Sequence, residues 1–146
     1  MADFFDNLVF SPEDVITFPG GIPGFEEHTR FVIAPMQECE PFSWLVCVDG
    51  GASLRFAIIN PLIFIPEYMP KLSKEQLSEL NISDLNNLLL YAIVTIGKNP
   101  IDSTVNLSGP IIINKPEKLG KQALIDDDRY GTQIPIFKKG GNKCSY

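Results

Sequence analysis

The stretch WLVCVDGGASLRFAII, residues 44–59, decides the fold. Two runs rich in β-branched and aromatic residues, 44–48 and 54–59, flank Asp49-Gly50-Gly51. Glycine adopts the positive φ angles that tight hairpin turns require, and runs of this composition on both sides favour strands. Residues 44–59 are therefore predicted to form one antiparallel hairpin.

Similar short runs, separated by glycine, proline or acidic residues, extend in both directions from this hairpin. They predict further strands at residues 15–18, 30–35, 87–97, 103–114, 121–125 and 133–137. Gly109-Pro110 interrupts the run at 103–114 and predicts a bulge or bend, because proline removes a ladder hydrogen bond. Many short strands with frequent turns predict a mainly β domain, an antiparallel barrel or sandwich.

The remaining elements are one helix and one loop. Ser73 and Gln76 have the spacing of a capping box and open a short helix over residues 73–82. Residues 61–70 contain three prolines, so this hydrophobic segment is predicted to be a loop or a sheet edge. Its Tyr68 has two readings, an aromatic anchor for a partner or packing over the end of a barrel.

Length and composition indicate a single cytoplasmic domain. The 146 residues match one domain, predicted over 1–137, followed by a polar tail at 138–146 that is expected to be disordered. The apolar runs are shorter than the roughly 20 residues that cross a bilayer. The first residues are acidic, where a signal peptide carries positive charge. The three cysteines, with neither metal-knuckle nor disulfide-framework spacing, are expected to be reduced thiols.

Charge is distributed unevenly along the chain. Residues 1–70 hold ten acidic and two basic residues, a net −8, so the rest contributes +2 to the total of −6. Binding to nucleic acid draws on Lys and Arg, so the acidic half disfavours it. The same half could attract a basic protein, or the charge could simply keep the domain soluble.

The segment FPGGIPGFEE, residues 18–27, could be a phosphate cradle, a turn or a surface for another protein. It has no G-x-G-x-x-G pattern and leads into a β-like run, so no helix N-terminus is available for a phosphate. Its glycines and prolines favour a compact turn, shaped by Gly21, Pro23 and Gly24 and anchored by neighbouring apolar residues. A purely structural turn remains the alternative to a binding surface.

The sequence contains no catalytic signature. The single histidine, His28, is expected to be a solvated turn residue rather than a general base. Asp126-Asp127-Asp128 lacks the spacing of a calcium loop and is expected to be a solvated turn. The prediction is therefore a protein that is not an enzyme, with no catalytic residue, no metal and no cofactor.

An ordered set of motifs resembles the flagellar assembly factor FliW family over residues 6–137. The motifs are ITFPGGIPGFEE (16–27), FSWLVCVD (42–49), FAIINPLIFIPEY (56–68), AIVTI (92–96), TVNLSGPIIIN (104–114) and GKQALIDDDRY (120–130). The chain departs from the family pattern at Ser108-Gly109, where the family has Arg-Ala, and at Val46, where the family has glutamine.

The resemblance implies a non-enzymatic, cytoplasmic bacterial protein with an antiparallel β-barrel-like fold. Members of the family bind flagellin. When flagellin is scarce they bind CsrA, an RNA-binding homodimer, and allosterically relieve its repression of flagellin translation. The predicted partners are accordingly flagellin and CsrA, with neither nucleic acid nor membrane bound directly.

Five residues are predicted to contact partners: Glu26, Glu27, Tyr68, Asn106 and Pro110. The two glutamates would act electrostatically, the tyrosine as an aromatic anchor, and the last two by presenting the bent strand. The alternative function is a β-barrel that binds or transforms a small ligand, with a pocket near His28 or the acids at 126–128.

Overall fold

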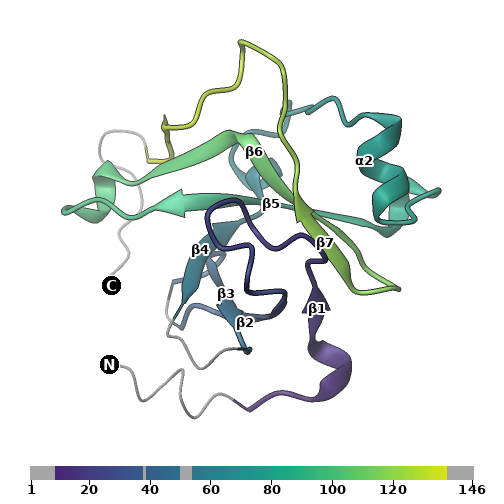
Figure 1. Cartoon of the computed structure of the whole chain (residues 1–146). Coiled ribbons are helices and arrows are strands. Elements are labelled where there is room, and N and C mark those ends of the chain that lie inside the picture. Colours follow the sequence, from purple (N-terminus) through teal and green to yellow (C-terminus); the bar gives the residue numbers. More distant parts are fainter. Residues whose placement is uncertain (1–8, 38, 50–53, 138–146) are drawn as a thin grey trace.

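The computed structural model describes residues 9–37, 39–49 and 54–137, and the tail predicted at 138–146 lies outside them. Eight strands form one sheet (Figure 1): β1 (Ile16–Thr17), β2 (Arg30–Pro35), β3 (Ser43–Cys47), β4 (Arg55–Ile59), β5 (Leu88–Thr95), β6 (Thr104–Asn114), β7 (Leu119–Gln122) and β8 (Ile134–Pro135). Each predicted strand is present, although several are shorter than their apolar runs.

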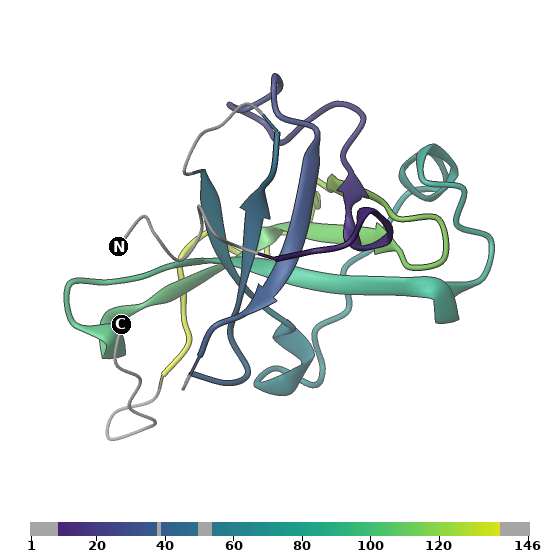
Figure 2. The same cartoon turned by 90° about the horizontal axis from the view of Figure 1, so that it is seen from below.

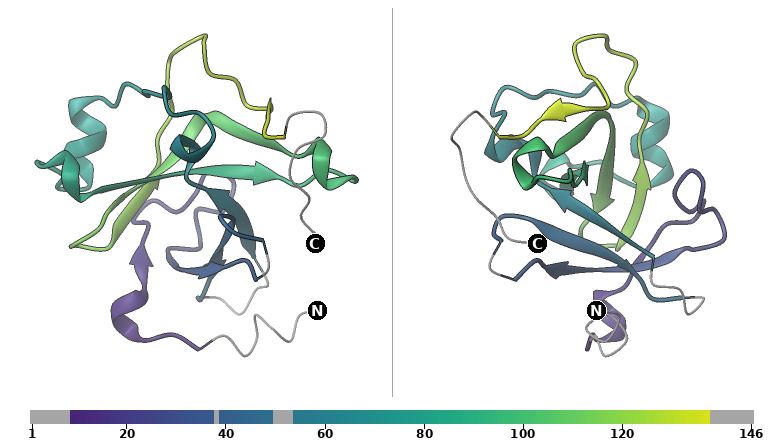
Figure 3. Two further views of the ribbon diagram at one scale, coloured as in Figure 1. Left: turned by 180° about the vertical axis from the view of Figure 1, so that it is seen from behind. Right: turned by 90° about the vertical axis from the view of Figure 1, so that its left-hand side faces the viewer.

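The sheet closes into a barrel. The strand order is β5-β4-β3-β2-β1-β7-β6-β8, and an additional pairing of β5 with β6 closes seven strands and leaves β8 outside. Figures 2 and 3 show the long β5 and β6 crossing over β2, β3 and β4. Neighbouring strands are antiparallel except β1 and β7, which pair in parallel at Thr17 and Leu119. The predicted mainly β barrel is confirmed, with the correction that its sheet is mixed.

The central hairpin is confirmed by its register. Trp44 pairs with Ala57 and Leu45 pairs with Phe56 across β3 and β4. Leu45 and Ile58 are fully buried, so one face of the hairpin contributes to the barrel interior. The predicted turn glycines, Gly50 and Gly51, lie outside the described residues.

The predicted interruption of the longest strand is a wide bulge in β6. Between the pairs Tyr91–Ile111 and Ile93–Asn106, two steps along β5 correspond to five along β6. The chain that follows β7 hydrogen-bonds to this bulge, from Ala123 N–H to Pro110 O at 2.8 Å and from Ile125 N–H to Ser108 O at 2.8 Å. The strand predicted at 121–125 therefore begins two residues earlier and continues as irregular pairing.

One short α-helix, α2 (Lys74–Glu79), is present in the part of the chain that the structure describes. Both capping-box hydrogen bonds form, from Gln76 N–H to Ser73 Oγ at 3.0 Å and from Ser73 N–H to Gln76 Oε1 at 2.9 Å. Leu77 and Leu80 pack against Ile112 of β6. The predicted helix is confirmed, but it ends earlier than residue 82 because the chain turns at Asn81, whose φ is +58°.

The described residues also contain four 3₁₀ helices. η1 (Pro12–Asp14) precedes β1, and η2 (Pro61–Ile63), η3 (Leu85–Asn87) and η4 (Pro100–Asp102) lie in connections between strands. The proline-rich segment 61–70 contains η2 and forms no strand, so of the two predicted possibilities it is the loop and not the sheet edge. None of the helices in the described ranges is long and apolar enough to cross a membrane.

The cysteines correct one expectation from the sequence. Cys39 is disulfide-bonded, so the expectation that all three cysteines are reduced thiols is wrong for this residue. Cys47 is a free and buried thiol at the end of β3. Cys144 lies outside the described residues.

Candidate functional site

The segment from Phe18 to His28 follows β1 and consists of successive tight turns; we call it the turn segment. Backbone hydrogen bonds close them, from Gly21 N–H to Phe18 O, from Phe25 N–H to Ile22 O and from His28 N–H to Phe25 O. In the second turn Pro23 takes the position that favours φ near −65°, and Gly24 takes the next position with φ +91°. This is the signature of a type II turn, so the predicted shaping role of Pro23 and Gly24 has a geometric basis.

Gly21 is fixed more tightly than Gly24. Its φ is +68°, and a Cβ placed on it would lie 2.5 Å from Glu26 Cα. A Cβ on Gly24 would meet nothing within 4 Å. The backbone of the segment folds back on itself at Gly21, and only a residue without a side chain permits that approach.

Apolar side chains hold the turn segment on the barrel. Phe18 and Ile22 are buried, and the Phe18 ring stacks edge-on against Phe31 at 5.1 Å. A Cβ on Gly120 of β7 would lie 2.8 Å from the Phe18 ring, so this glycine lets the strand approach. The turn segment is therefore an ordered surface that is held on the barrel by buried apolar side chains.

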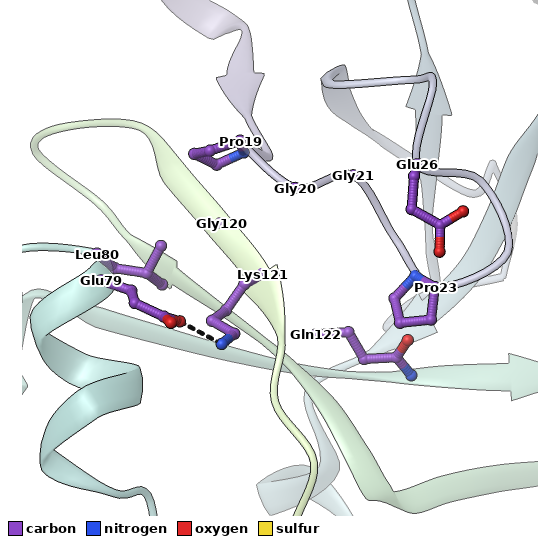
Figure 4. A pocket seen from close by; sticks show the side chains of 10 residues that line it. All are labelled: Pro19, Gly20, Gly21, Pro23, Glu26, Glu79, Leu80, Gly120, Lys121 and Gln122. Atoms are coloured by element: carbon purple, nitrogen blue, oxygen red, sulfur yellow. Dashed lines mark hydrogen bonds and ion pairs between the residues drawn. The ribbon is translucent and has the colours of Figure 1, made fainter.

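A groove of about 590 Å³ lies between the turn segment and β7 (Figure 4). The turn segment forms one wall, and the end of α2 with β7 forms the other. The groove is lined by Pro19, Gly20, Gly21, Pro23, Glu26, Glu79, Leu80, Gly120, Lys121 and Gln122. Lys121 forms an ion pair with Glu79 across the second wall.

Glu26 gives the first wall a fixed negative charge. Its carboxylate accepts a hydrogen bond of 3.0 Å from Gly24 N–H, and this bond lowers the pKa of Glu26. Glu27 follows on the same segment and is also exposed. Of the two glutamates predicted to act electrostatically, Glu26 lines the groove, and Glu27 is exposed next to it in the chain; a partner's cations could reach both.

The other three predicted contact residues gather around the β6 bulge, and two of them are buried. The Tyr68 hydroxyl donates a 2.6 Å hydrogen bond to Leu107 O, and its ring packs edge-on against Tyr130 at 4.7 Å. Tyr68 is 3% exposed, which favours packing over the barrel end, the alternative that the sequence left open. Pro110 is fully buried, so it presents no side chain to a partner in this conformation.

Asn106 has a local role. Its Oδ1 accepts hydrogen bonds of 2.9 Å from both Ser108 N–H and Gly109 N–H, so it fixes the backbone of the bulge. The bulge touches the groove through Gln122, whose side chain donates to Gly109 O at 2.9 Å. Changes at Ser108-Gly109, where the chain departs from the family pattern that it resembles, can thus reach the groove.

The sequence missed the second wall of the groove. Glu79 and Lys121 are 42 positions apart, with β5 and β6 between them in the chain. No local sequence pattern links the end of the helix to a strand so much later in the chain. The capping box that fixes α2 and the bulge that bends β6 are the only signals in the sequence that bear on their meeting.

The alternative function, a pocket for a small ligand, was predicted near the acids at 126–128 or near His28. Asp127 forms an ion pair of 2.7 Å with Arg129, whose side-chain hydrogen bond lowers the pKa of Asp127 to about 2. Asp126 and Asp128 are exposed, and a hydrogen bond from Tyr130 N–H to Asp127 O closes a turn at the surface, as expected. His28 is different: its side chain is 21% exposed and its Nδ1 lies 3.7 Å from Asp49 Oδ1, so it is not a solvated turn residue.

Comparisons with known proteins agree on one family. The family profile described as "FliW protein" matches residues 2–136. The chain is 39% identical to the flagellar assembly factor FliW of Thermoanaerobacter pseudethanolicus over 97% of this chain and 94% of that protein. It is 38% identical to the protein of the same name from Alkaliphilus metalliredigens, over 92% and 83% of the two chains. A crystal structure of the flagellar assembly factor FliW superimposes with a TM-score of 0.83 and 33% identity, covering 90% of this chain and 92% of that one.

Proposed function

The chain belongs to the FliW family of flagellar assembly factors, and we propose that it works by binding proteins and catalyses no reaction. Its partners are flagellin and, when flagellin is scarce, the translational regulator CsrA. Binding to CsrA allosterically antagonises that regulator and relieves repression of flagellin translation, and rising flagellin recaptures the factor. The protein acts in the cytoplasm and binds neither nucleic acid nor membrane directly.

The observation that carries this proposal is the turn segment and its groove. A rigid, glycine-shaped wall presents Glu26 beside an open groove, with the exposed Glu27 next in the chain, and apolar packing beneath fixes the wall in place. Such a pre-ordered, charged rim suits recognition of a protein surface, because little conformational entropy is lost on docking.

Electrostatics supports a basic partner. Among the described residues, six acids of the acidic half are exposed: Glu13, Asp14, Glu26, Glu27, Glu40 and Glu67. A pair of opposite charges 4 Å apart in water is worth about 1 kcal/mol, and salt at 0.15 M screens charges beyond about 8 Å. Several such acids brought near the phosphate path of an RNA-binding dimer would disfavour RNA by summed repulsion.

Titration of the purified protein with each partner, alone and in competition, tests the proposal. We expect saturable binding of flagellin and of CsrA, with flagellin displacing CsrA, and antagonism of RNA binding that weakens as salt rises. The double variant E26K/E27K should weaken binding of CsrA. The matched charge reversal E67K, on an exposed acid of the proline-rich segment, should leave the contribution of the groove to CsrA binding unchanged.

Two outcomes would overturn the proposal. Failure of the natural chain to bind either protein would remove the function itself. Antagonism of RNA binding that is indifferent to salt would leave partner binding intact and refute the electrostatic explanation.

A further inference from the structure

Three side chains that differ in chemistry meet at the end of the turn segment, and none of them lines the groove; we call them the His-Cys-Asp cluster. His28 ends the turn segment, Cys47 ends β3, and Asp49 follows two residues later. One nitrogen, one sulfur and one carboxylate oxygen, each a potential metal ligand, lie within 4.8 Å of one another. The cluster joins two parts of the chain that are nineteen or more residues apart.

Asp49 is oriented by its neighbours. Its Oδ2 accepts a hydrogen bond of 3.1 Å from Thr29 N–H and a longer one of 3.4 Å from Thr29 Oγ1. This leaves Oδ1 facing the other two members, 3.1 Å from Cys47 Sγ and 3.7 Å from His28 Nδ1. Support of a ligating carboxylate by an outer hydrogen bond is a regular feature of metal sites.

His28 Nδ1 has no satisfactory partner within the protein. The atom is fully buried and makes no hydrogen bond, because 3.7 Å to Asp49 is too long for one. Buried polar atoms are nearly always hydrogen-bonded. A buried nitrogen without a hydrogen bond, close to two other potential metal ligands, therefore indicates a missing partner. A cation bound between the three side chains would supply that partner.

We propose that the His-Cys-Asp cluster binds Zn²⁺ through His28 Nδ1, Cys47 Sγ and Asp49 Oδ1. In tetrahedral zinc sites neighbouring ligand atoms are separated by about 3.3 to 3.6 Å, as the usual bond lengths require. The separations in the chain, 3.1 and 3.7 Å to Asp49 with all three atoms within 4.8 Å, need only small side-chain shifts to match. This proposal revises the sequence-based prediction that the chain holds no metal.

The donor set selects the ion. A thiolate and an imidazole favour zinc and related transition metals, whereas magnesium and calcium require oxygen ligands. The side chains of His28 and Asp49 are 21% and 25% exposed, so a fourth position is open to water. Without a metal, the Cys47 thiol donates hydrogen bonds to Asp49 O and Oδ1. On binding, the thiol proton leaves to solvent as the sulfur–metal bond forms.

The ion would connect the turn segment to the β3–β4 hairpin. Links that already exist near this point include the hydrogen bonds from Thr29 to Asp49, one of 2.9 Å from Val48 N–H to Arg30 O, and the pairing of Phe31 with Cys47. Because a ligand that binds only the folded chain stabilises it, zinc should raise the melting temperature.

The test uses the untagged full chain, in which His28 is the single histidine. Titration with Co²⁺ without reductant should give a thiolate-to-cobalt charge-transfer absorption that saturates at one ion per chain. Zn²⁺ should abolish this absorption, and Mg²⁺ should not. In a long-range ¹H–¹⁵N spectrum the one imidazole should show Nδ1 shifted by zinc and Nε2 protonated.

Variants assign the ligands. H28Q keeps every cysteine and should weaken cobalt binding at least tenfold, and C47S should abolish the charge-transfer absorption. D49N should also weaken binding, whereas E26Q, which removes a carboxylate of the same segment outside the cluster, should bind as the natural chain does. Absence of saturable absorption, or absorption unchanged in H28Q, would overturn the proposal. The imidazole spectrum of the natural chain decides the matter even if C47S fails to fold.

Discussion

A comparison of three alanine variants in the turn segment separates backbone strain from steric contact. Gly20 and Gly24 both have open space where a Cβ would lie, but only Gly24 has positive φ, at +91°. Gly21 combines φ +68° with a Cβ position 2.5 Å from Glu26 Cα and 2.9 Å from its carbonyl carbon and oxygen. In the series G20A, G24A and G21A, the first variant therefore has neither cost, the second has backbone strain alone, and the third has backbone strain and a steric clash.

The expected losses follow from these geometries. A left-handed conformation costs a residue with a Cβ about 1–2 kcal/mol, which is the whole loss expected for G24A. Forced overpacking against a backbone adds about 1–3 kcal/mol, so G21A should lose about 2–5 kcal/mol in free energy of unfolding. G20A should change by no more than about 0.5 kcal/mol, as is usual for exposed positions without special geometry. The branched variant G24V should be worse than G24A.

Urea unfolding followed by circular dichroism and by Trp44 fluorescence measures the series, with coincident transitions as the check that unfolding is two-state. The slope against urea should be unchanged, so that the midpoints report stability directly. A G21A protein as stable as G24A would refute the contact with Glu26. Equal midpoints for G24A and G20A would refute the strained turn.

Three further predictions concern other parts of the chain. Y68F should lose about 1–3 kcal/mol of unfolding free energy, because Leu107 O is left without its 2.6 Å donor, and full binding of both partners by the folded variant would remove Tyr68 from the contact surface. The depressed pKa of Asp127, about 2 against an ordinary 3.8, adds stability that is present above the ordinary value and is lost as pH falls through about 2; a carboxyl NMR titration should show the low midpoint, and R129Q should move it upward. K121E should alter partner binding while melting shifts little, since an exposed ion pair is worth about 0–1 kcal/mol, and a large loss of stability would contradict that assignment.

Most of the fold follows from local signals. The hairpin at 44–59, the capped helix and the bulge at Gly109-Pro110 each depend on residues that are neighbours in sequence, and each is present. The parallel contact between β1 and β7 depends on barrel closure instead, and closure brings Thr17 beside Leu119. Periodicity within one strand contains no information about that meeting, so the predicted antiparallel barrel holds for every strand pairing except this one.

The candidate site was predictable only on one side. The turn chemistry of Pro23 and Gly24 identifies one wall of the groove, because turn types are set by two or three residues. Lys121 and Glu79 on the other wall meet through tertiary packing. Tyr68 illustrates the opposite difficulty, since an aromatic residue among prolines gives the same sequence pattern whether it faces a partner or, as here, is buried and hydrogen-bonded to Leu107 O.

The turn segment links the two proposals by position. Its residues between Pro19 and Glu26 form a wall of the groove, and its last residue, His28, belongs to the His-Cys-Asp cluster. The segment is already held by buried Phe18 and Ile22 and by its own backbone hydrogen bonds, so the groove exists without an ion. A ligand shifts an equilibrium only by its differential affinity for two states, and a wall that is already ordered leaves little to shift. Zinc should therefore raise stability more than it changes affinity for flagellin or CsrA. A large effect of zinc on partner binding would show that the turn segment moves when partners dock, and that its strained glycines are hinges as well as supports.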